Sequence, residues 1–264
     1  MNIETGPSRY LTIEGNIGAG KTTFCAEVRK RLGSKKEPEH SFIYSLDDIL
    51  NEPVTQYESY NFEGTQHNPL NSLYTNTKTD VGFCQLHFLV ASADYFNADH
   101  DSWQEHFLTD RCYISTVLFI LLYYKLGYFS QFIFHYLLDI FLKLLHKAFI
   151  PDCFIYLDVP SKLCYERMKQ RNRDSESSMN IFTIEVLNDI LKEWFTHLKK
   201  YNYNVIHLTV NENETPGEIV DKMDNYYFPY YYNKKTSEEK RELMIKVVRS
   251  FIMKQILTVK EFEL

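Results

Sequence analysis

Apolar and polar residues along this chain follow two repeating patterns. Short apolar runs bounded by polar or turn residues are typical of buried strands, and apolar positions three and four residues apart are typical of helices. The first pattern predicts strands at 10–14, 107–108, 154–157 and 205–208, with weaker candidates at 42–46 and 49–53. The second predicts helices at 22–32, 70–75, 82–97, 112–126, 129–148, 161–171, 183–199 and 216–226. Because the two kinds of element alternate, we expect an α/β fold with a doubly wound, parallel, five-stranded sheet flanked by helices.

The end of the chain follows a different pattern. Thr236 and Glu239 have the spacing of a capping box, in which each side chain bonds the other residue's backbone amide at the start of a helix. An apolar stripe with helical spacing comes next, at Leu243, Val247, Val248, Phe251 and Ile252. We therefore expect one domain over 1–228 and a C-terminal helical extension over 229–264. Packing of this helix on the domain is the simpler expectation, and binding to a partner is the alternative.

The stretch 116–150 is very apolar, but its pattern does not predict a membrane span. Its longest uninterrupted part, 116–124, is far shorter than the roughly 20 residues that a spanning helix needs. Charged residues such as Lys125 and Asp139 interrupt the remainder. We expect buried helices that also serve a subunit interface, so that a homodimer forms through helices within 112–148.

Composition and charge narrow the class of protein. The net charge of −6 and the pI near 5.9 argue against a nucleic-acid coat or a binder of anionic membranes, because both need a basic face. Five cysteines at wide spacings suggest neither a zinc site nor a disulfide framework, and fit a reducing compartment. Residues 1–10 lack the apolar run of a signal peptide. We expect a cytoplasmic protein that binds neither nucleic acid nor membrane.

The strongest chemical signal is a glycine-rich segment between the first predicted strand and the first predicted helix. It matches the pattern GxxxxGK[ST], in which backbone amides at a helix N-terminus surround phosphate oxygens. The lysine reaches the β- and γ-phosphates, and the hydroxyl after it can ligate Mg²⁺. The alternative is a plain glycine-rich turn, but the flanking strand and helix favour the phosphate site. The residues concerned are Gly15, Asn16, Ile17, Gly18, Ala19, Gly20, Lys21, Thr22 and Thr23.

Charged residues elsewhere fit the same phosphate chemistry. Asp110 ends a predicted buried strand, where a carboxylate can hold Mg²⁺ directly or through water, and Arg111 follows it. Arg167 and Arg171 share one predicted helix face, and Arg173 lies in the loop beyond. Three converging guanidinium groups would form a clamp that closes over ATP. A surface ion pair and a solvated basic helix end are the alternative interpretations.

Together these residues resemble the deoxynucleoside kinase family, which includes deoxycytidine and deoxyguanosine kinases, mitochondrial thymidine kinase and an insect multisubstrate enzyme. The segment IEGNIGAGK at 13–21 is close to the P-loop sequence typical of that family, and the resemblance covers about 10–225. It implies a P-loop kinase with an arginine-rich lid that uses ATP and Mg²⁺ to phosphorylate the 5′-hydroxyl of a deoxynucleoside. Two departures are that Asp110 replaces the family's Glu and Cys112 its Ser.

The resemblance also implies roles for single residues. Glu52, in the segment Glu-Pro-Val, corresponds to the general base, and it joins Lys21, Arg111 and Asp110 as a catalytic residue. Gln85 corresponds to the residue that reads the base edge. The family's ligands of the 3′-hydroxyl correspond to Tyr74 and Glu176, and its adenine-flanking loop to Glu212, Asn213 and Glu214.

Aromatic and small polar residues complete the expected nucleoside site. Tyr57, Phe83 and Phe88 are candidates to sandwich the base. Ser92 and Thr116 fall where cytidine and purine kinases carry an Arg and an Asp. Two small polar residues leave room for a thymine methyl, so thymidine or mixed pyrimidine deoxynucleosides are favoured over a strict reading of cytosine or guanine.

Two other functions stay open on the sequence. A thymidylate kinase also has a P-loop, an Asp-Arg pair and a lid, but it phosphorylates a phosphate and needs no carboxylate base. A non-catalytic structural subunit is the alternative from another class, because one respiratory-complex subunit is similar to these kinases. The presence of Lys21, Thr22, Asp110 and the lid arginines favours the enzyme.

Overall fold

A parallel five-stranded sheet forms the centre of the molecule. The computed structural model describes residues 9–34, 46, 48–62, 64–75, 80–97, 106–173, 176, 179–224 and 236–262. The strands lie in the order β2-β5-β1-β6-β7. Their bounds are β1 Arg9–Gly15, β2 Asp48–Leu50, β5 His106–Asp110, β6 Cys153–Asp158 and β7 Asn204–Thr209. The α/β fold predicted from the sequence is confirmed.

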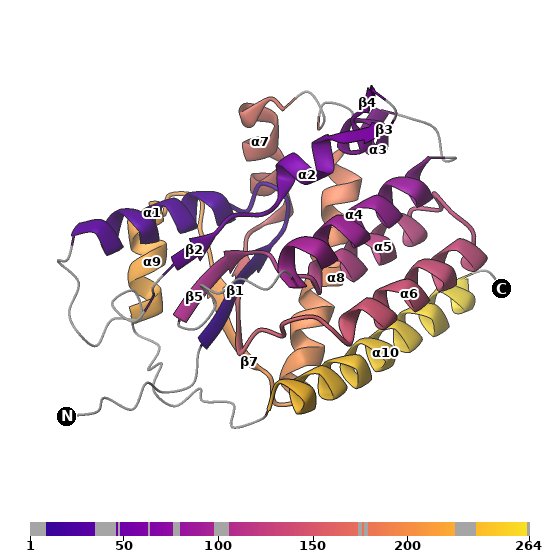
Figure 1. Cartoon of the computed structure of the whole chain (residues 1–264). Helices are drawn as coiled ribbons and strands as arrows, with labels where there is room; N and C mark the ends of the chain where they lie inside the picture. The colour runs from indigo at the N-terminus through magenta and orange to yellow at the C-terminus, as the bar shows by residue number, and fades with distance from the viewer. Residues whose placement is uncertain are drawn as a thin grey trace.

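Helices cover both sides of this sheet (Figure 1). On one side, α1 (Lys21–Ser34) packs against α9 (Pro216–Asp224). The other side carries α4 (Val81–Asn97), α5 (Ser115–Lys125), α6 (Gln131–Leu145) and α8 (Ile181–Lys200). Between β6 and α8, α7 (Ser161–Arg171) stands at the carboxyl edge of the sheet. The layers are those of a doubly wound sheet, whose ligands bind at the carboxyl ends of the strands.

The segment between β2 and α4 holds more structure than the sequence pattern predicts. It contains the short helices α2 (Val54–Glu58) and α3 (Pro69–Thr75) and a hairpin of β3 (Tyr60–Phe62) and β4 (Thr65–His67). Only the helix at 70–75 was expected. Each strand of the hairpin has three residues, and β4 holds no apolar residue, so the pattern is too short to predict it. The strand candidate at 42–46 lies outside the described residues, apart from Leu46.

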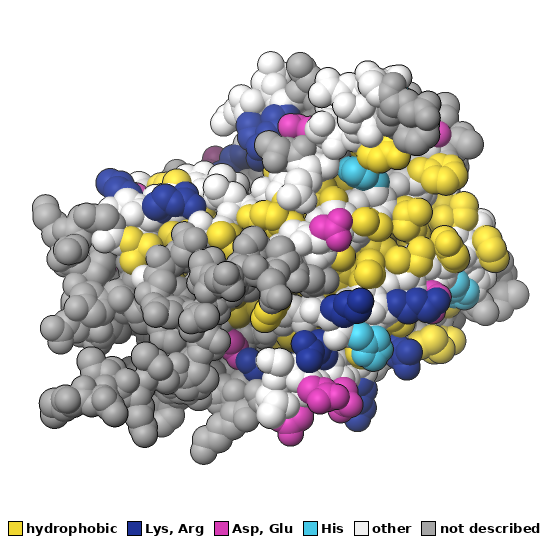
Figure 2. All heavy atoms as spheres, viewed as in Figure 1, with side chains coloured by type: hydrophobic (Ala, Val, Ile, Leu, Met, Phe, Trp, Pro, Cys, Tyr) yellow, Lys and Arg dark blue, Asp and Glu magenta, His cyan; other side chains and the backbone are white. Residues whose placement is uncertain are grey.

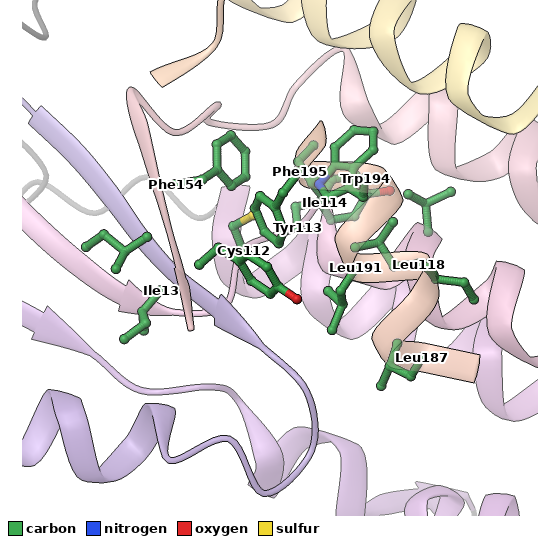
Figure 3. Close-up of a cluster of buried hydrophobic side chains, with 14 of the residues drawn as sticks. Ile13, Cys112, Tyr113, Ile114, Leu118, Phe154, Leu187, Leu191, Trp194 and Phe195 are labelled. Carbon is green, nitrogen blue, oxygen red and sulfur yellow. The ribbon is translucent and has the colours of Figure 1, made fainter. Parts of the chain in front are cut away.

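The core forms where β1, β6 and the turn after β5 meet α5 and α8. Figure 3 shows this cluster, whose labelled side chains are Ile13, Cys112, Tyr113, Ile114, Leu118, Phe154, Leu187, Leu191, Trp194 and Phe195. All of them are at most 2 % exposed. Such close packing fixes the carboxyl ends of β1 and β5, and therefore the residues that follow them.

The C-terminal helix α10 (Ser237–Phe262) joins this same core. Its start is a capping box, in which the Thr236 amide donates to Glu239 Oε2 over 2.6 Å and the Glu239 amide donates to Thr236 Oγ1 over 3.2 Å. Its buried face lies against α8 and α6. Figure 1 shows it running along α6. The expected packing of the extension on the domain is what the structure shows, and both belong to one hydrophobic cluster.

The apolar stretch 116–150 forms the two helices α5 and α6. In the described part of the chain, no helix is long and apolar enough to cross a membrane. The two helices differ in exposure: α5 shows no exposed side chain, whereas Phe132, Ile133 and Tyr136 of α6 are exposed. Of the two helices within 112–148, α5 is therefore an interior helix, and α6 is the one with an exposed apolar face.

Candidate active site

The glycine-rich segment forms a tight loop between β1 and α1. Gly18 and Gly20 have φ values of +77° and +91°, a region that favours glycine. A Cβ atom on Gly18 would lie 2.1 Å from the carbonyl oxygen of Cys164 in α7. Glycine at this position therefore lets the loop lie directly against α7.

Side-chain and backbone bonds hold the loop in this shape. Asn16 donates its amide to the Ile184 carbonyl over 2.8 Å and accepts from the Ile17 amide over 2.8 Å. Lys21 Nζ donates to the carbonyls of Asn16 and Gly15 over 2.9 and 3.3 Å. Burial lowers the pKa of Lys21 to about 8, and nearby Arg111 adds to this effect. The lysine lies folded over its own loop, in the place where a phosphate-binding cation is needed.

Thr22 and Asp110 face each other across the start of α1. The Thr22 hydroxyl donates to Asp110 Oδ2 over 2.7 Å. The second oxygen, Oδ1, is buried without a hydrogen-bond partner among the described residues. A hydroxyl beside a buried carboxylate oxygen that still needs a partner fits Mg²⁺, which takes oxygen ligands. A cluster of three or more metal-binding side chains is absent from the part of the chain that the structure describes, so most ligands would come from water and phosphate.

Arg111 lies between two carboxylates. Its backbone has a φ of +66° and its amide donates to the Ile13 carbonyl over 3.0 Å. Its Nη1 lies 3.5 Å from Glu14 Oε2, and its Nε lies 3.2 Å from Glu52 Oε1. The guanidinium also stacks over Phe119, 5.0 Å from the ring centre. The left-handed backbone at a buried arginine is a strained conformation of the kind found at functional sites.

Two adjoining cavities open beside these residues. The larger, of about 910 Å³, is lined by Ile17, Gly18, Lys21, Thr22, Asn51, Glu52, Val54, Tyr57, Leu70, Asp110, Arg111, Phe119, Arg171, Arg173 and Glu176. The smaller, of about 530 Å³, is lined by Glu52, Tyr57, Leu70, Leu73, Gln85, Phe88, Arg111, Cys112, Ser115, Thr116 and Phe119. We call them the phosphate cavity and the nucleoside cavity. Glu52 and Arg111 line both, so the two groups expected to act on the reacting oxygen lie where the cavities join.

The nucleoside cavity is apolar except for a few polar groups. Gln85 is 2 % exposed, and its Nε2 has no hydrogen-bond partner among the described residues. Tyr57 and Phe88 meet edge to face, with ring centres 5.1 Å apart. The Thr116 hydroxyl donates to the Tyr113 carbonyl over 2.7 Å. An unpartnered buried amide beside two aromatic rings suits a planar ligand with a polar edge.

Three of the predicted nucleoside contacts need correction or cannot be described. Phe83 is 75 % exposed and is not among the described residues that line the cavity, so it does not sandwich a base. Ser92 is fully buried behind Tyr57, whose hydroxyl lies 2.6 Å from the Ser92 hydroxyl. Ser92 therefore acts on the cavity through Tyr57. The side chain of Tyr74, on α3, lies outside the described residues.

The lid arginines separate into two groups. Arg171 Nη2 contacts both carboxylate oxygens of Glu176 over 2.5 and 2.7 Å, and Arg173 Nη1 lies 3.8 Å from the same carboxylate. These three residues line the phosphate cavity. Arg167 instead lines a third cavity of about 560 Å³ on the outer side of the loop, with Ala19, Gly20, Thr23, Phe24, Leu157, Glu214, Pro216 and Ile219. Glu212 and Asn213 are exposed and are not among the described residues lining it, so only Glu214 of that predicted set does.

Several site residues were not predicted from the sequence. Glu14 is a buried carboxylate among them, and Asn51, Leu70, Ser115 and Phe119 are four of the others. Glu14 does leave a signal, because it is a charged residue at the inner end of a buried strand. The remaining four depend on the course of the chain between elements, which no local pattern shows.

Comparisons with known proteins identify the family of this chain. A family model described as "Deoxynucleoside kinase" matches residues 11–227. Deoxyguanosine kinase from Dictyostelium discoideum is 24% identical over 225 residues, which cover 84% of this chain and 70% of that protein. NADH dehydrogenase [ubiquinone] 1 alpha subcomplex subunit 10 from Mus musculus is 25% identical over 227 residues, which cover 82% of this chain and 61% of that one.

The fold also matches a solved structure. Deoxyadenosine kinase from M. mycoides, with products dCMP and a flexible dCDP bound, superposes with a TM-score of 0.63 at 23% identity. The match covers 82% of this chain and 97% of that chain. Because the family match ends at residue 227, α10 lies beyond it.

Proposed function

This chain belongs to the deoxynucleoside kinase family, and from that premise we propose that it transfers the γ-phosphate of ATP to the 5′-hydroxyl of a deoxynucleoside. The observation that carries the proposal is the junction of the two cavities. A phosphate site on one side and an apolar site with a free amide on the other meet at Glu52 and Arg111. A phosphoryl donor and a nucleoside bound in these cavities would meet there.

The phosphate cavity holds the triphosphate. Backbone amides of the loop and Lys21 Nζ bind the phosphate oxygens, and Lys21 exchanges its bonds to Gly15 and Asn16 for bonds to phosphate. Thr22 and Asp110 are the residues that would hold Mg²⁺, which would neutralise charge on the phosphates. Arg171 and Arg173 line the same cavity and stabilise the negative charge that develops on the transferring group.

Glu52 accepts the proton of the 5′-hydroxyl as that oxygen attacks. Its carboxylate is half-buried and lines both cavities, which is the position that a general base needs. Arg111 lines the phosphate cavity and pairs with Glu52, and we propose that it contacts the transferring phosphoryl group there. Glu176 and Tyr74 are proposed to hold the 3′-hydroxyl of the sugar.

Gln85 reads the base edge in the nucleoside cavity. Its amide both donates and accepts, so it pairs with the complementary edge of a base held between Tyr57 and Phe88. Away from Glu52 and Arg111, the described lining is uncharged. This favours thymidine or mixed pyrimidine deoxynucleosides over a base that needs a charged partner.

A scaffolding role is the second candidate, because one similar protein is a subunit of NADH dehydrogenase. A scaffold performs no catalysis, so nothing would require the catalytic side chains to stay together at one site. Here Lys21, Thr22, Asp110, Arg111 and Glu52 all line one cavity. This arrangement favours the enzyme.

The deciding experiment is product formation from Mg-ATP with the four deoxynucleosides and with dTMP. Phosphorylation of a deoxynucleoside, lost in Lys21→Ala and in Glu52→Gln, supports the proposal. Turnover of dTMP alone would move the protein to the thymidylate kinases. ATP binding without turnover of any substrate would favour the scaffold. Full turnover by Glu52→Gln would remove its assignment as the base.

We also propose that two copies of the chain associate through α4 and α6. Phe83 and Val90 of α4 are exposed, as are Ile133 and Tyr136 of α6, and Gly82 faces Ile133 where the two helices meet. Figure 2 shows hydrophobic side chains gathered over α4 and its border with α6. Such a continuous apolar surface is typical of a subunit interface.

Light scattering tests this association. Tyr136→Glu should convert a dimer to a monomer, because it places a charge on the apolar surface. Met253→Glu is the matched control, since Met253 is equally exposed but lies on α10. A wild-type protein that is monomeric at high micromolar concentration would refute the interface.

A further inference from the structure

Glu14 is a buried carboxylate that neither site cavity includes among its described lining residues. It lies near the carboxyl end of β1, one residue before the glycine-rich loop. Its Oε1 accepts hydrogen bonds from the Ser115 hydroxyl and from the Cys112 thiol, the latter over 3.5 Å. A carboxylate this deep in the core needs a compensating charge.

That charge is the guanidinium of Arg111. Glu14 Oε2 lies 3.5 Å from Arg111 Nη1 and has no hydrogen-bond partner among the described residues. The bonds from Ser115 and Cys112 fix the carboxylate plane, so Oε2 is aimed at the arginine. Burial raises the pKa of Glu14, while Arg111, the Ser115 hydroxyl, Lys21 and Cys112 act in the opposite direction.

Arg111 therefore contacts two carboxylates that differ in exposure, and we call them its anchor and its working partner. Glu14, the anchor, is almost wholly shielded from solvent, and Glu52, the working partner, reaches into the cavities. We infer that Glu14 is a positioning residue, which holds the Arg111 guanidinium against the pull of Glu52 so that it faces the transferring phosphoryl group. This inference rests on the proposed kinase function.

The geometry explains why Arg111 needs such an anchor. Its backbone is already in a left-handed conformation, so the side chain enters the site in a direction fixed by the Ile13 carbonyl bond. Glu52 is already the nearer carboxylate, at 3.2 Å against 3.5 Å for Glu14, so with Glu14 neutral nothing would balance its attraction for the guanidinium. Arg111 would then pair with the base more closely and face the phosphate less well.

The first test compares Glu14→Gln with Thr12→Val. Thr12 is buried on the same strand two residues earlier, so its variant controls for loss of a buried polar group on β1. Glu14→Gln keeps the shape and an acceptor for Ser115 but removes the charge. We expect kcat to fall on the order of tenfold to 100-fold, as for a misplaced catalytic group, with KM for both substrates little changed. Thr12→Val should keep the wild-type kcat.

A second readout does not depend on turnover. The Nη–H signals of Arg111 in the NMR spectrum, assigned by their loss in Arg111→Lys, report the contact with Glu14, because Nη1 is the atom that faces it. One such signal should be protected from solvent exchange in the wild type and in Thr12→Val. It should lose protection in Glu14→Gln. If no deoxynucleoside is phosphorylated, the kinase proposal fails, yet this signal still tests the anchor.

The result that overturns the inference is equally specific. A Glu14→Gln protein with wild-type kcat and a protected Arg111 signal would show that Glu14 does not position the arginine. Should Glu14→Gln fail to fold, Glu14→Asp replaces it, because it keeps the charge at a shorter reach. We expect an intermediate kcat with unchanged KM, and a wild-type kcat with an unaltered Arg111 signal would overturn the inference.

Discussion

The phosphate cavity and the nucleoside cavity adjoin, yet they are built by different means. The phosphate cavity depends on backbone: Gly18 and Gly20 adopt left-handed φ values, and Lys21 bonds to the carbonyls of its own loop. The nucleoside cavity depends on side chains from helices, chiefly Gln85 and Phe88 of α4. A backbone site is determined by a short contiguous motif, whereas a side-chain site is determined by how helices lie relative to each other.

Removal of Lys21 should have the largest effect, a loss of function of the phosphate cavity. In Lys21→Ala we expect kcat to fall on the order of 10²-fold to 10³-fold, because a preorganised cation is lost from the transferring phosphoryl group. Nucleoside binding, measured by calorimetry without ATP, should stay within about threefold of wild type, since one group on one side is lost. Equal loss on both sides would show that the two cavities do not act independently.

Loss of the Gln85 amide should break the nucleoside side. Gln85→Leu keeps the volume but removes the free amide, and we expect kcat/KM for the nucleoside to fall about tenfold to 100-fold, the usual cost of an unpaired polar edge. Gln255→Leu is the matched control, because Gln255 is an equally buried amide on α10 that bonds Glu193. If ATP affinity falls as much as nucleoside affinity, Gln85 acts on the fold and not on the base.

The pH dependence of ATP binding sharpens the comparison. Burial lowers the pKa of Lys21 to about 8, so the free protein loses this positive charge as the pH rises through 8. Phosphate binding requires the protonated lysine, so the Kd for ATP should be flat below pH 7 and should rise by up to about tenfold per pH unit above 8. Calorimetry from pH 6.5 to 9.5 checks this. The Kd for the nucleoside should not rise above pH 8, and Lys21→Met should abolish this rise in the Kd for ATP.

The smallest effect is expected from Ser92, which contributes to the nucleoside cavity through Tyr57. Ser92→Ala removes the bond to the Tyr57 hydroxyl, and we expect KM for the nucleoside to rise about threefold to tenfold, as for the loss of one neutral hydrogen bond. Phe83→Leu should leave this KM unchanged, because Phe83 is not among the described residues that line the nucleoside cavity. An effect of Phe83→Leu equal to that of Ser92→Ala would contradict the assignment of the two faces of α4.

The same contrast explains what could be predicted from the sequence. The strands and the larger helices have strong patterns, and the motif from Gly15 to Thr22 carries its geometry with it, so both follow from local residues. Asp110 and Arg111 could be placed because β5 pairs with β1 in parallel, so the end of β5 lies beside the glycine-rich loop that follows β1. The hairpin at 60–67 has strands of only three residues, of which Thr65–His67 holds no apolar residue, and its presence was not predicted.

Side-chain direction on α4 was the harder problem. Phe83, Gln85 and Ser92 share one helix, and only rotation of that helix decides which of them faces the cavity. Rotation is set by packing against α3, α5 and α6, contacts that come from distant parts of the chain. Family resemblance located Gln85 but not the pairing of Ser92 with Tyr57.

The order of the elements along the chain has a consequence for biosynthesis. The face of α8 that carries Trp194 is covered by Phe251 of α10, with ring centres 5.1 Å apart. Because α10 comes after every other described helix, this apolar face is translated well before its cover. During synthesis this apolar face is therefore exposed and can bind chaperones. A chain truncated before α10 would keep the face exposed.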